Sequence, residues 1–363
     1  MSKEHIPAYL YLEDGSVFKG WSMGKAGVSI GEIVFNTSMA SYEGLLCDPT
    51  YYGQIVAQTY PLVGNRGVKQ GAQSQIMAKG YICREWCDSP TDAWGRLTLD
   101  EYLKERGIVG LWGIDTRRLT RIIRGNGYMK AAITPSIDDK DWLMDQMKNY
   151  TIKGAVRAVT SDKVSYVKAP SPTYNMAIID MGLEHSVLEW FLSRGVSITI
   201  YPAFTPPAEI LAAKFDGIMI SDGPGDPDEE RELINNIKEL FKSGIPLFGM
   251  GLGHQMLALA AGFSCDKMDR PHRGANQPVR DLRTGKLMIT HQNHGYTVLE
   301  NSVNAKAEVF LKSVNDDSVE GIKYNQIPAF SVQFAPVDGL GYQDTAWVFD
   351  EFVKMMEEGR NNA

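Results

Sequence analysis

Residues 244–262 read Gly-Ile-Pro-Leu-Phe-Gly-Met-Gly-Leu-Gly-His-Gln-Met-Leu-Ala-Leu-Ala-Ala-Gly. The apolar run Ile245–Phe248 meets a Gly-x-Gly-x-Gly turn, and an apolar helical stretch follows until Gly262. Small residues two positions either side of a corner residue are typical of a nucleophile elbow, where one side chain stands exposed between strand and helix. The corner residue here is Gly251, which has no side chain. The stretch therefore predicts the scaffold of an acyl-transfer site without its nucleophile.

The chain before this elbow alternates between short apolar runs and amphipathic stretches. Strands are expected at Met176–Asp180, Val196–Tyr201, Gly217–Ser221 and Ile245–Phe248, and helices at Ser186–Ser193, Pro207–Lys214 and Asp228–Ser243. Alternation of this kind is typical of a doubly wound α/β sheet, with chemistry at the carboxyl ends of the strands. We expect residues 174–363 to form one Rossmann-like domain of this class.

The first 150 residues mix short strands with turn signals and a few helices, which predicts a separate α/β domain. Strands are expected at Ala8–Leu12, Val17–Lys19, Ile33–Phe35, Gln54–Gln58 and Gln75–Ala78, and helices at Leu97–Glu105 and Asp115–Arg124, the latter ended by Gly125. Residues 151–173 carry Lys, Ser, Pro and Thr without a persistent apolar period. We therefore expect this segment to be a linker.

Composition excludes several classes of function. A net charge of -7 over 363 residues argues against nucleic acid or an anionic membrane as the main partner. The start lacks an apolar leader and no apolar run is long enough to cross a bilayer, so a cytoplasmic location is expected. Cys83 and Cys87 are spaced like metal ligands, but no second pair lies near them, and no metal site is expected.

The glycine-rich segments allow further interpretations. Ser221–Pro227 has two glycines that free backbone N–H groups to face a ligand, although Gly-Pro-Gly alone is also an ordinary tight turn. The elbow glycines could also belong to a dinucleotide site. Their third member, Gly253, comes one residue early for Gly-x-Gly-x-x-Gly, which disfavours that interpretation.

Several motifs resemble class I glutamine amidotransferases, and more narrowly the small subunit of carbamoyl phosphate synthetase. In the second half these are Gly223-Pro-Gly-Asp-Pro, the elbow Phe248–Gln255, His272-Arg-Gly-Ala-Asn-x-Pro278 and Gln292-Asn-His-Gly295. In the first half they are Gly31–Met39, Asp48–Tyr51, Pro61–Asn65 and Ile114–Thr120. The resemblance implies glutamine hydrolysis by a Cys-His-Glu triad, with ammonia passed to a large subunit that makes carbamoyl phosphate from bicarbonate and ATP.

The sequence departs from the family pattern at all three triad positions. Gly251 stands at the nucleophile position of the elbow. The family's closing motif, Ser-x-Gln-x-His-Pro-Glu-Ala, is here Ser-Val-Gln-Phe-Ala-Pro-Val-Asp, which puts Ala335 at the base position and Val337 at the acid position. All six histidines lie at or before His294. Since removing triad members costs comparable hydrolases roughly 10⁴–10⁶ in rate, we expect glutaminase activity to be absent or vestigial.

The substrate-contact positions of the family are mostly filled by suitable residues, so a pocket for glutamine remains an open expectation. By resemblance they are Thr50, Gly223, Gly225, Leu252, Gln255, Asn293, Gly295 and Tyr296. Asp222 replaces the Asn usual before Gly-Pro-Gly, and its carboxylate would oppose a nearby anion. Cys265 is interpreted as a packed thiol rather than a replacement nucleophile.

Two functions follow from the resemblance. In the first, the chain docks on the large synthetase subunit, which would hold the ATP and Mg²⁺, and the complex uses free ammonia; no cofactor is expected in this chain. In the second, the chain is a non-catalytic regulatory module that binds glutamine or a similar amide.

Overall fold

The computed structural model describes residues 5–38, 42–69, 75–90, 96–336 and 343–361. The chain divides into two compact units, Met1–Ile152 and Lys153–Ala363. The segment 151–173, expected to be a linker, contains α5 (Ala155–Val159) and β12 (Ser165–Val167). None of the helices in the described ranges is long and apolar enough to span a bilayer.

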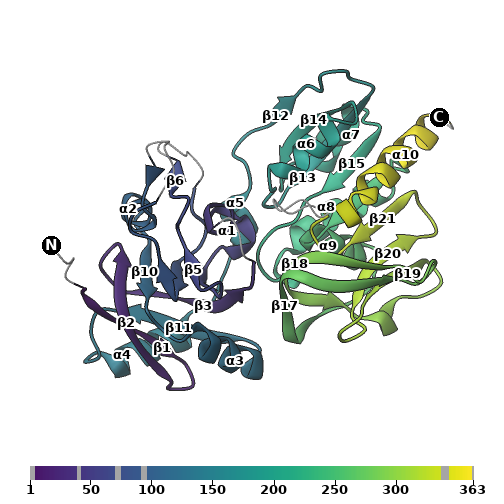
Figure 1. Cartoon of the computed structure of the whole chain (residues 1–363). Coiled ribbons are helices and arrows are strands. Elements are labelled where there is room, and N and C mark those ends of the chain that lie inside the picture. Colours follow the sequence, from purple (N-terminus) through teal and green to yellow (C-terminus); the bar gives the residue numbers. More distant parts are fainter. Residues whose placement is uncertain (1–4, 39–41, 70–74, 91–95, 337–342, 362–363) are drawn as a thin grey trace. The chain divides into compact units, whose positions relative to one another are not determined.

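The first unit is built on a closed barrel with strand order β1-β11-β3-β4-β7-β10-β2 (Figure 1). The strands are β1 (Pro7–Leu12), β2 (Val17–Gly24), β3 (Ser29–Asn36), β4 (Gln54–Gln58), β7 (Gly80–Cys83), β10 (Val109–Trp112) and β11 (Met129–Thr134). Short pairs are made by β5 (Leu62–Val63) with β8 (Glu85–Trp86), and by β6 (Val68–Lys69) with β9 (Arg96–Leu97). The helices are α1 (Tyr42–Cys47), η1 (Pro49–Tyr51), α2 (Leu99–Glu105), α3 (Thr116–Asn126) and α4 (Lys140–Asn149).

The second unit is a mixed sheet with strand order β12-β14-β13-β15-β16-β21-β20-β19-β17-β18. Its parallel part is formed by β14 (Val196–Pro202), β13 (Tyr174–Asp180), β15 (Gly217–Ile220), β16 (Leu247–Met250) and β21 (Ala329–Val332). Antiparallel strands continue it with β20 (Val319–Tyr324), β19 (Ala307–Ser313), β17 (Cys265–Asp281) and β18 (Leu287–Val298). The fold is thus α/β in both units, as the sequence predicts.

Helices cover both faces of this sheet. They are α6 (Ser186–Leu192), α7 (Pro207–Ala212), α8 (Arg231–Phe241), α9 (Leu252–Ala260) and α10 (Trp347–Asn361), with single turns η2 (Pro227–Glu229), η3 (Glu300–Ser302) and η4 (Gln343–Thr345) (Figure 1). Successive residues of β13 point to opposite faces: Ala177 and Ile179 join the apolar cluster of α7, α8 and α9, whereas Met176 and Ile178 join that of α6 and α10. The apolar run Met176–Ile179 of β13 therefore has buried side chains on both faces, which is typical of a strand covered on both sides.

Three local expectations differ from the structure. Leu97, expected at the start of a helix, lies in β9, and α2 begins at Leu99. A strand is expected at Gln75–Ala78, but these residues form no strand or helix. The helix α3 is expected to end at Gly125, but it continues to Asn126 and is capped by Gly127, whose φ is 72°. Gly127 is the glycine that the left-handed backbone at a helix end requires, whereas Gly125 lies within the last turn.

Candidate functional site

The elbow at Gly251 has the backbone geometry that its sequence predicts. Gly251 is the N-cap of α9 with φ 55° and ψ -115°, a conformation that strains any residue with a Cβ. Its N–H donates to the carbonyl of Val332 on the neighbouring strand β21 at 3.0 Å. A Cβ at Gly253 would overlap the carbonyl oxygen of Ile220, so the close approach of α9 to β15 requires a glycine. The strand, corner and helix of a nucleophile elbow are therefore all present.

The Asp222 carboxylate occupies the place into which a side chain at position 251 would project. A Cβ built on Gly251 would overlap Asp222 Oδ1 and Cγ. Oδ1 accepts hydrogen bonds from the backbone N–H of Leu252 at 2.8 Å and from that of Gly223 at 2.7 Å. Backbone donors beside an elbow are the kind of group that holds the oxyanion in acyl transfer. Here a charged acceptor within the protein already takes both of them.

The positions expected for base and acid follow β21. Ala335 is half-buried, and its N–H donates to the carbonyl of His291 at 3.1 Å. It lies three residues beyond Val332, the residue whose carbonyl accepts from the elbow. A methyl group at position 335 accepts no proton. Val337 lies outside the described residues.

Two other groups near the elbow lack the properties of a replacement. Burial raises the pKa of the Cys265 thiol, and the nearby carboxylates of Asp228 and Asp226 raise it further, which disfavours the nucleophilic thiolate. Burial also lowers the pKa of His254 to about 3. His254 Nδ1 lies 2.8 Å from Ser331 Oγ, and the ring is completely buried. His254 is therefore a neutral core residue rather than an accessible base.

Most of the predicted substrate-contact residues meet around the carboxyl ends of β15 and β16. Leu252 and Gly223 are joined through Asp222, as above. The Gln255 amide nitrogen donates to the carbonyl of Tyr296 at 3.0 Å and to Gln333 Oε1 at 2.9 Å. The Tyr296 hydroxyl donates to Asp226 Oδ2 at 2.9 Å, next to Gly225. Much of the polar capacity expected to serve glutamine is thus used inside the protein.

The remaining predicted contacts are placed as follows. Asn293 lies on β18, where its side-chain oxygen accepts from Arg273, and Gly295 is half-buried on the same strand. Thr50 belongs to the first unit, in η1, where its N–H and its hydroxyl both donate to Asp48 Oδ1. The assignment of these residues to a glutamine site stays a prediction.

A second polar cluster lies on the antiparallel part of the sheet. His272 on β17 faces His294 on β18, with ring centroids 5.1 Å apart, and Glu320 on β20 lies against both. Burial opposes charge on His272, but the hydrogen-bonded carboxylate of Asp316 and the nearby carboxylate of Glu320 outweigh it and raise its pKa to about 9. Burial holds the pKa of His294 well below its usual range and raises that of Glu320. Sequence analysis missed this cluster. His272, His294 and Glu320 are 22 and 26 residues apart, and such long separations match no known sequence motif.

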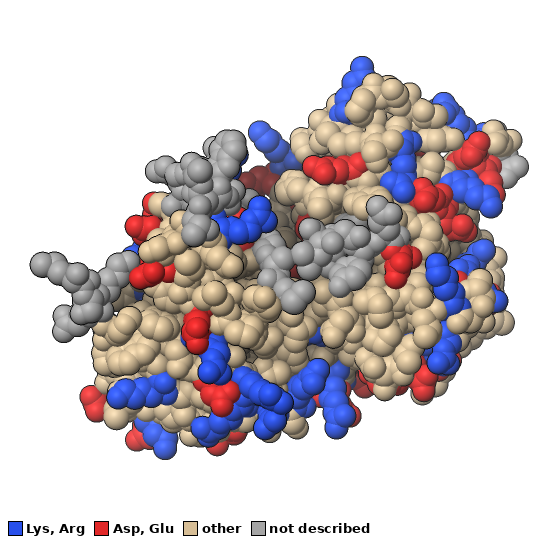
Figure 2. Space-filling view, viewed as in Figure 1, with Lys and Arg blue, Asp and Glu red and all other residues tan. Residues whose placement is uncertain are grey.

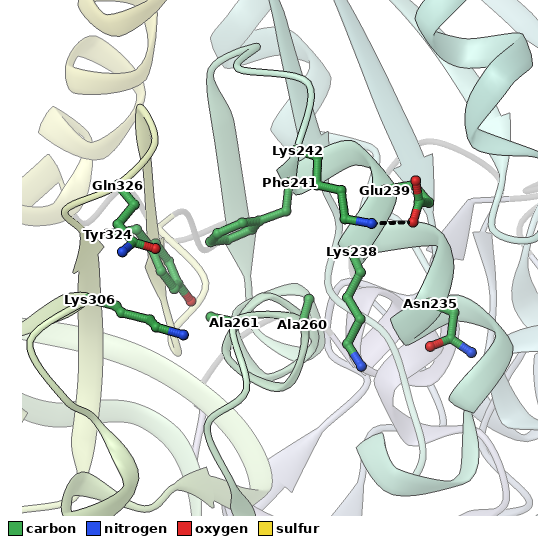
Figure 3. A pocket seen from close by; sticks show the side chains of 10 residues that line it. All are labelled: Asn235, Lys238, Glu239, Phe241, Lys242, Ala260, Ala261, Lys306, Tyr324 and Gln326. Carbon is green, nitrogen blue, oxygen red and sulfur yellow. Dashed lines mark hydrogen bonds and ion pairs between the residues drawn. The ribbon is translucent and has the colours of Figure 1, made fainter.

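A pocket of about 420 Å³ lies elsewhere in the second unit, beside α8, the end of α9 and β20. Figure 3 shows Lys238 and Lys306 flanking Ala260 and Ala261, with Lys242 bonded to Glu239. Its lining includes none of the residues predicted for the glutamine site. It is therefore distinct from the elbow.

Known proteins match both halves of the chain. The model of "Carbamoyl-phosphate synthase small chain, CPSase domain" matches residues 10–133, and that of "Glutamine amidotransferase class-I" matches residues 177–355. The pyrimidine-specific small chain of carbamoyl phosphate synthase from Bacillus subtilis is 41% identical over 350 residues, which cover 96% of this chain and 95% of the relative. The small chain from Listeria monocytogenes is 40% identical, covering 98% and 99%.

A solved structure resembles about half of the chain. It is a protein from Thermoplasma acidophilum described as belonging to GMP synthase, and it superposes with a TM-score of 0.46 at 20% identity, covering 52% of this chain and 96% of its own.

Proposed function

Because the chain belongs to the carbamoyl phosphate synthase small-chain family, we propose that it is the small subunit of a carbamoyl phosphate synthetase whose own glutamine hydrolysis has been lost. It docks on the large synthetase subunit, which holds ATP and Mg²⁺. The complex takes free ammonia in place of ammonia released from glutamine. This chain then contributes binding and stability rather than a covalent step.

The occupation of the elbow by Asp222 is the observation that carries this proposal. Loss of the thiol alone would leave an empty oxyanion site. Instead the carboxylate fills the space above Gly251 and holds the N–H groups of Leu252 and Gly223. A glutamine carbonyl bound as in the family would have to displace the Asp222 carboxylate from the N–H groups of Leu252 and Gly223. Such a site disfavours amide hydrolysis at the level of binding as well as chemistry.

An arginine-lined pocket on the first unit supports a docking role. The pocket measures about 500 Å³, and its cationic lining is Arg84, Arg117, Arg121 and Arg124. The last three lie on α3 and are exposed, at positions that share one helix face. Figure 2 shows Lys and Arg gathered over the face that carries α3. Like charges collected on one surface of a chain of net charge -7 favour an anionic partner surface.

The alternative function, a regulatory module that senses glutamine, is less favoured. It requires free donors and acceptors in the pocket. The Gln255 amide nitrogen is already bonded to Tyr296 and Gln333, and the elbow donors are bonded to Asp222.

Co-expression with a large synthetase chain of the same organism tests the docking role. We expect the two chains to co-elute in size-exclusion chromatography as a stable complex. A small chain that elutes alone at every concentration tested would contradict the proposal.

A further inference from the structure

The cluster of His272, His294 and Glu320 presents three ligand atoms to one buried point. These atoms all lie within 4.8 Å of one another. His272 Nδ1 lies 3.4 Å from Glu320 Oε1, and His294 Nε2 lies 3.8 Å from the same oxygen. The exposed fractions of the three side chains are 8%, 7% and 0%. The separations are longer than good hydrogen bonds, which have a mode near 2.9 Å.

The hydrogen bonds around the cluster orient His294 and Gln292 so that lone pairs, rather than N–H groups, face this point. His294 Nδ1 lies 2.8 Å from the carbonyl of Tyr296, which can only accept, so Nδ1 carries the proton and Nε2 presents its lone pair. Gln292 donates its amide N–H to Glu320 Oε2 at 2.7 Å, and this turns its own oxygen toward His294 Nε2, 3.4 Å away. Acceptors that face one another away from water are costly unless something positive lies between them.

His272 completes the arrangement. Its Nε2 lies 2.9 Å from the carboxylate of Asp316, and its buried Nδ1 has no hydrogen-bond partner. A histidine that gives one ring nitrogen to a carboxylate and offers the other to the interior has the orientation of a metal ligand. The carbonyl of Tyr296 plays the same orienting part for His294.

We propose that His272 Nδ1, His294 Nε2 and Glu320 Oε1 bind a divalent transition-metal ion, with Zn²⁺ as the preferred ion. Two imidazoles and a carboxylate form a set of ligands that suits Zn²⁺. Ligands about 2.1 Å from a tetrahedral ion lie about 3.4 Å apart, close to the 3.4 and 3.8 Å that separate the two imidazole nitrogens from Glu320 Oε1. Gln292 Oε1, which lies 3.4 Å from His294 Nε2, offers a fourth ligand atom for the ion. Glu320 and Asp316 together balance the double charge of the ion.

The role of the ion is structural. It would tie β17, β18 and β20 together beside the segment Asn293–Tyr296, which the family resemblance assigns to glutamine binding. None of the three ligand residues belongs to the elbow or to the triad positions, so metal binding here does not depend on the proposed function. The competing occupant is a proton on His272, which would make an ion pair with Glu320, and the experiment separates the two.

The test uses the full chain, freed of any affinity tag. Metal content is measured by mass spectrometry, and Zn²⁺ is then removed with a chelator and titrated back by calorimetry. We expect a single Zn²⁺ per chain and a lower thermal unfolding midpoint after chelation. Failure of the chain to bind added Zn²⁺ would overturn the proposal in favour of the proton.

Three variants locate the site. Glu320→Gln keeps the size of the side chain but removes the anionic ligand, and should abolish binding. Asp316→Asn, at a half-exposed position outside the ligand set, should weaken binding by about 10–100-fold and covers the case in which Glu320→Gln does not fold. The matched control His185→Gln removes an exposed histidine of the same unit and should change nothing. Binding that is unaltered in both Glu320→Gln and Asp316→Asn would contradict the assignment.

Discussion

At the scale of single residues, Asp222 and Gly251 act as a pair. Gly251 tolerates φ 55° without strain and leaves space above the corner, and the Asp222 carboxylate fills that space. Gly251 alone would be explained by simple loss of a nucleophile, but the Asp222 carboxylate in the space above it would not. Together they make the elbow incompatible with a side chain at position 251 unless Asp222 moves. Restoring activity through the family triad therefore also requires a change at Asp222.

The first prediction concerns Asp222. The triple change Gly251→Cys, Ala335→His and Val337→Glu should give a protein that remains inactive on glutamine, because the new cysteine meets the Asp222 carboxylate. Adding Asp222→Asn, the residue usual in the family, weakens the two bonds from Leu252 and Gly223 and should yield activity. Ammonia release from glutamine is the measurement. Equal activity of the triple and quadruple variants would show that Asp222 does not obstruct the site.

The second prediction concerns His254. Its pKa is lowered to about 3 by burial, so the folded protein keeps it neutral while the unfolded chain takes up a proton near pH 6.5. The contribution of neutral His254 to the free energy of unfolding is complete above pH 6.5. It is lost as the pH falls below 6.5, by up to roughly 1.4 kcal/mol per pH unit. Urea unfolding between pH 7 and pH 5 should show a smaller loss of stability in His254→Gln than in the native chain. Parallel losses would refute the role of His254.

Among the helices and strands, sequence periodicity predicted those that follow a regular pattern of apolar residues. The strand at Gln54–Gln58 was confirmed at both ends. Within the helix expected at Asp228–Ser243, α8 spans Arg231–Phe241 and buries Leu233, Ile237 and Leu240 on one face. The long hairpin of β17 and β18 was not predicted as strands; its residues were noted only as family motifs. Its polar residues, such as His272 and Gln292, are buried and contact the Glu320 carboxylate, so hydrophobic alternation does not mark them.

The candidate site divides in the same way. The elbow was predictable because a sharp turn between a buried strand and a helix demands glycines at fixed spacing. The conformation of Asp222 was not predictable, since it depends on the N–H groups of Leu252 and Gly223, which only the folded chain brings together.

The third prediction tests the glycine requirement of the elbow. Gly253→Ala places a Cβ against the carbonyl of Ile220 and 2.8 Å from that of Ser221, backbone atoms that cannot move cheaply. We expect a loss of about 1–3 kcal/mol in unfolding free energy. The control Gly125→Ala lies in α3 with no atom within 4 Å of the new Cβ, and should gain about 0.5–1 kcal/mol. Denaturant titration measures both, and an unchanged stability of Gly253→Ala would contradict the packing argument.

At the scale of the whole molecule, the two units divide the proposed work. The first carries the arginine pocket, and the second keeps an elbow that its own carboxylate fills. A chain that had lost glutamine hydrolysis and also its partner would have no use for the barrel unit. The similarity to the small chains of Bacillus and Listeria covers both units. This favours continued assembly with a large subunit.

The fourth prediction concerns assembly. The double change Arg117→Glu and Arg121→Glu reverses charge on the exposed face of α3 and should weaken binding to the large chain by roughly 10-fold or more. Lys140→Glu reverses an exposed charge at the start of α4 in the same unit and should leave binding unchanged. Affinity is measured by surface plasmon resonance at fixed ionic strength. Equal affinity of the double variant and the native chain would exclude this face from the interface.

The nitrogen source used by the assembled complex shows whether this chain has lost glutamine hydrolysis. Carbamoyl phosphate formation is measured with bicarbonate and ATP, once with ammonium chloride and once with glutamine. We expect synthesis from ammonium and none above background from glutamine. Synthesis from glutamine at a rate comparable with that from ammonium would contradict it.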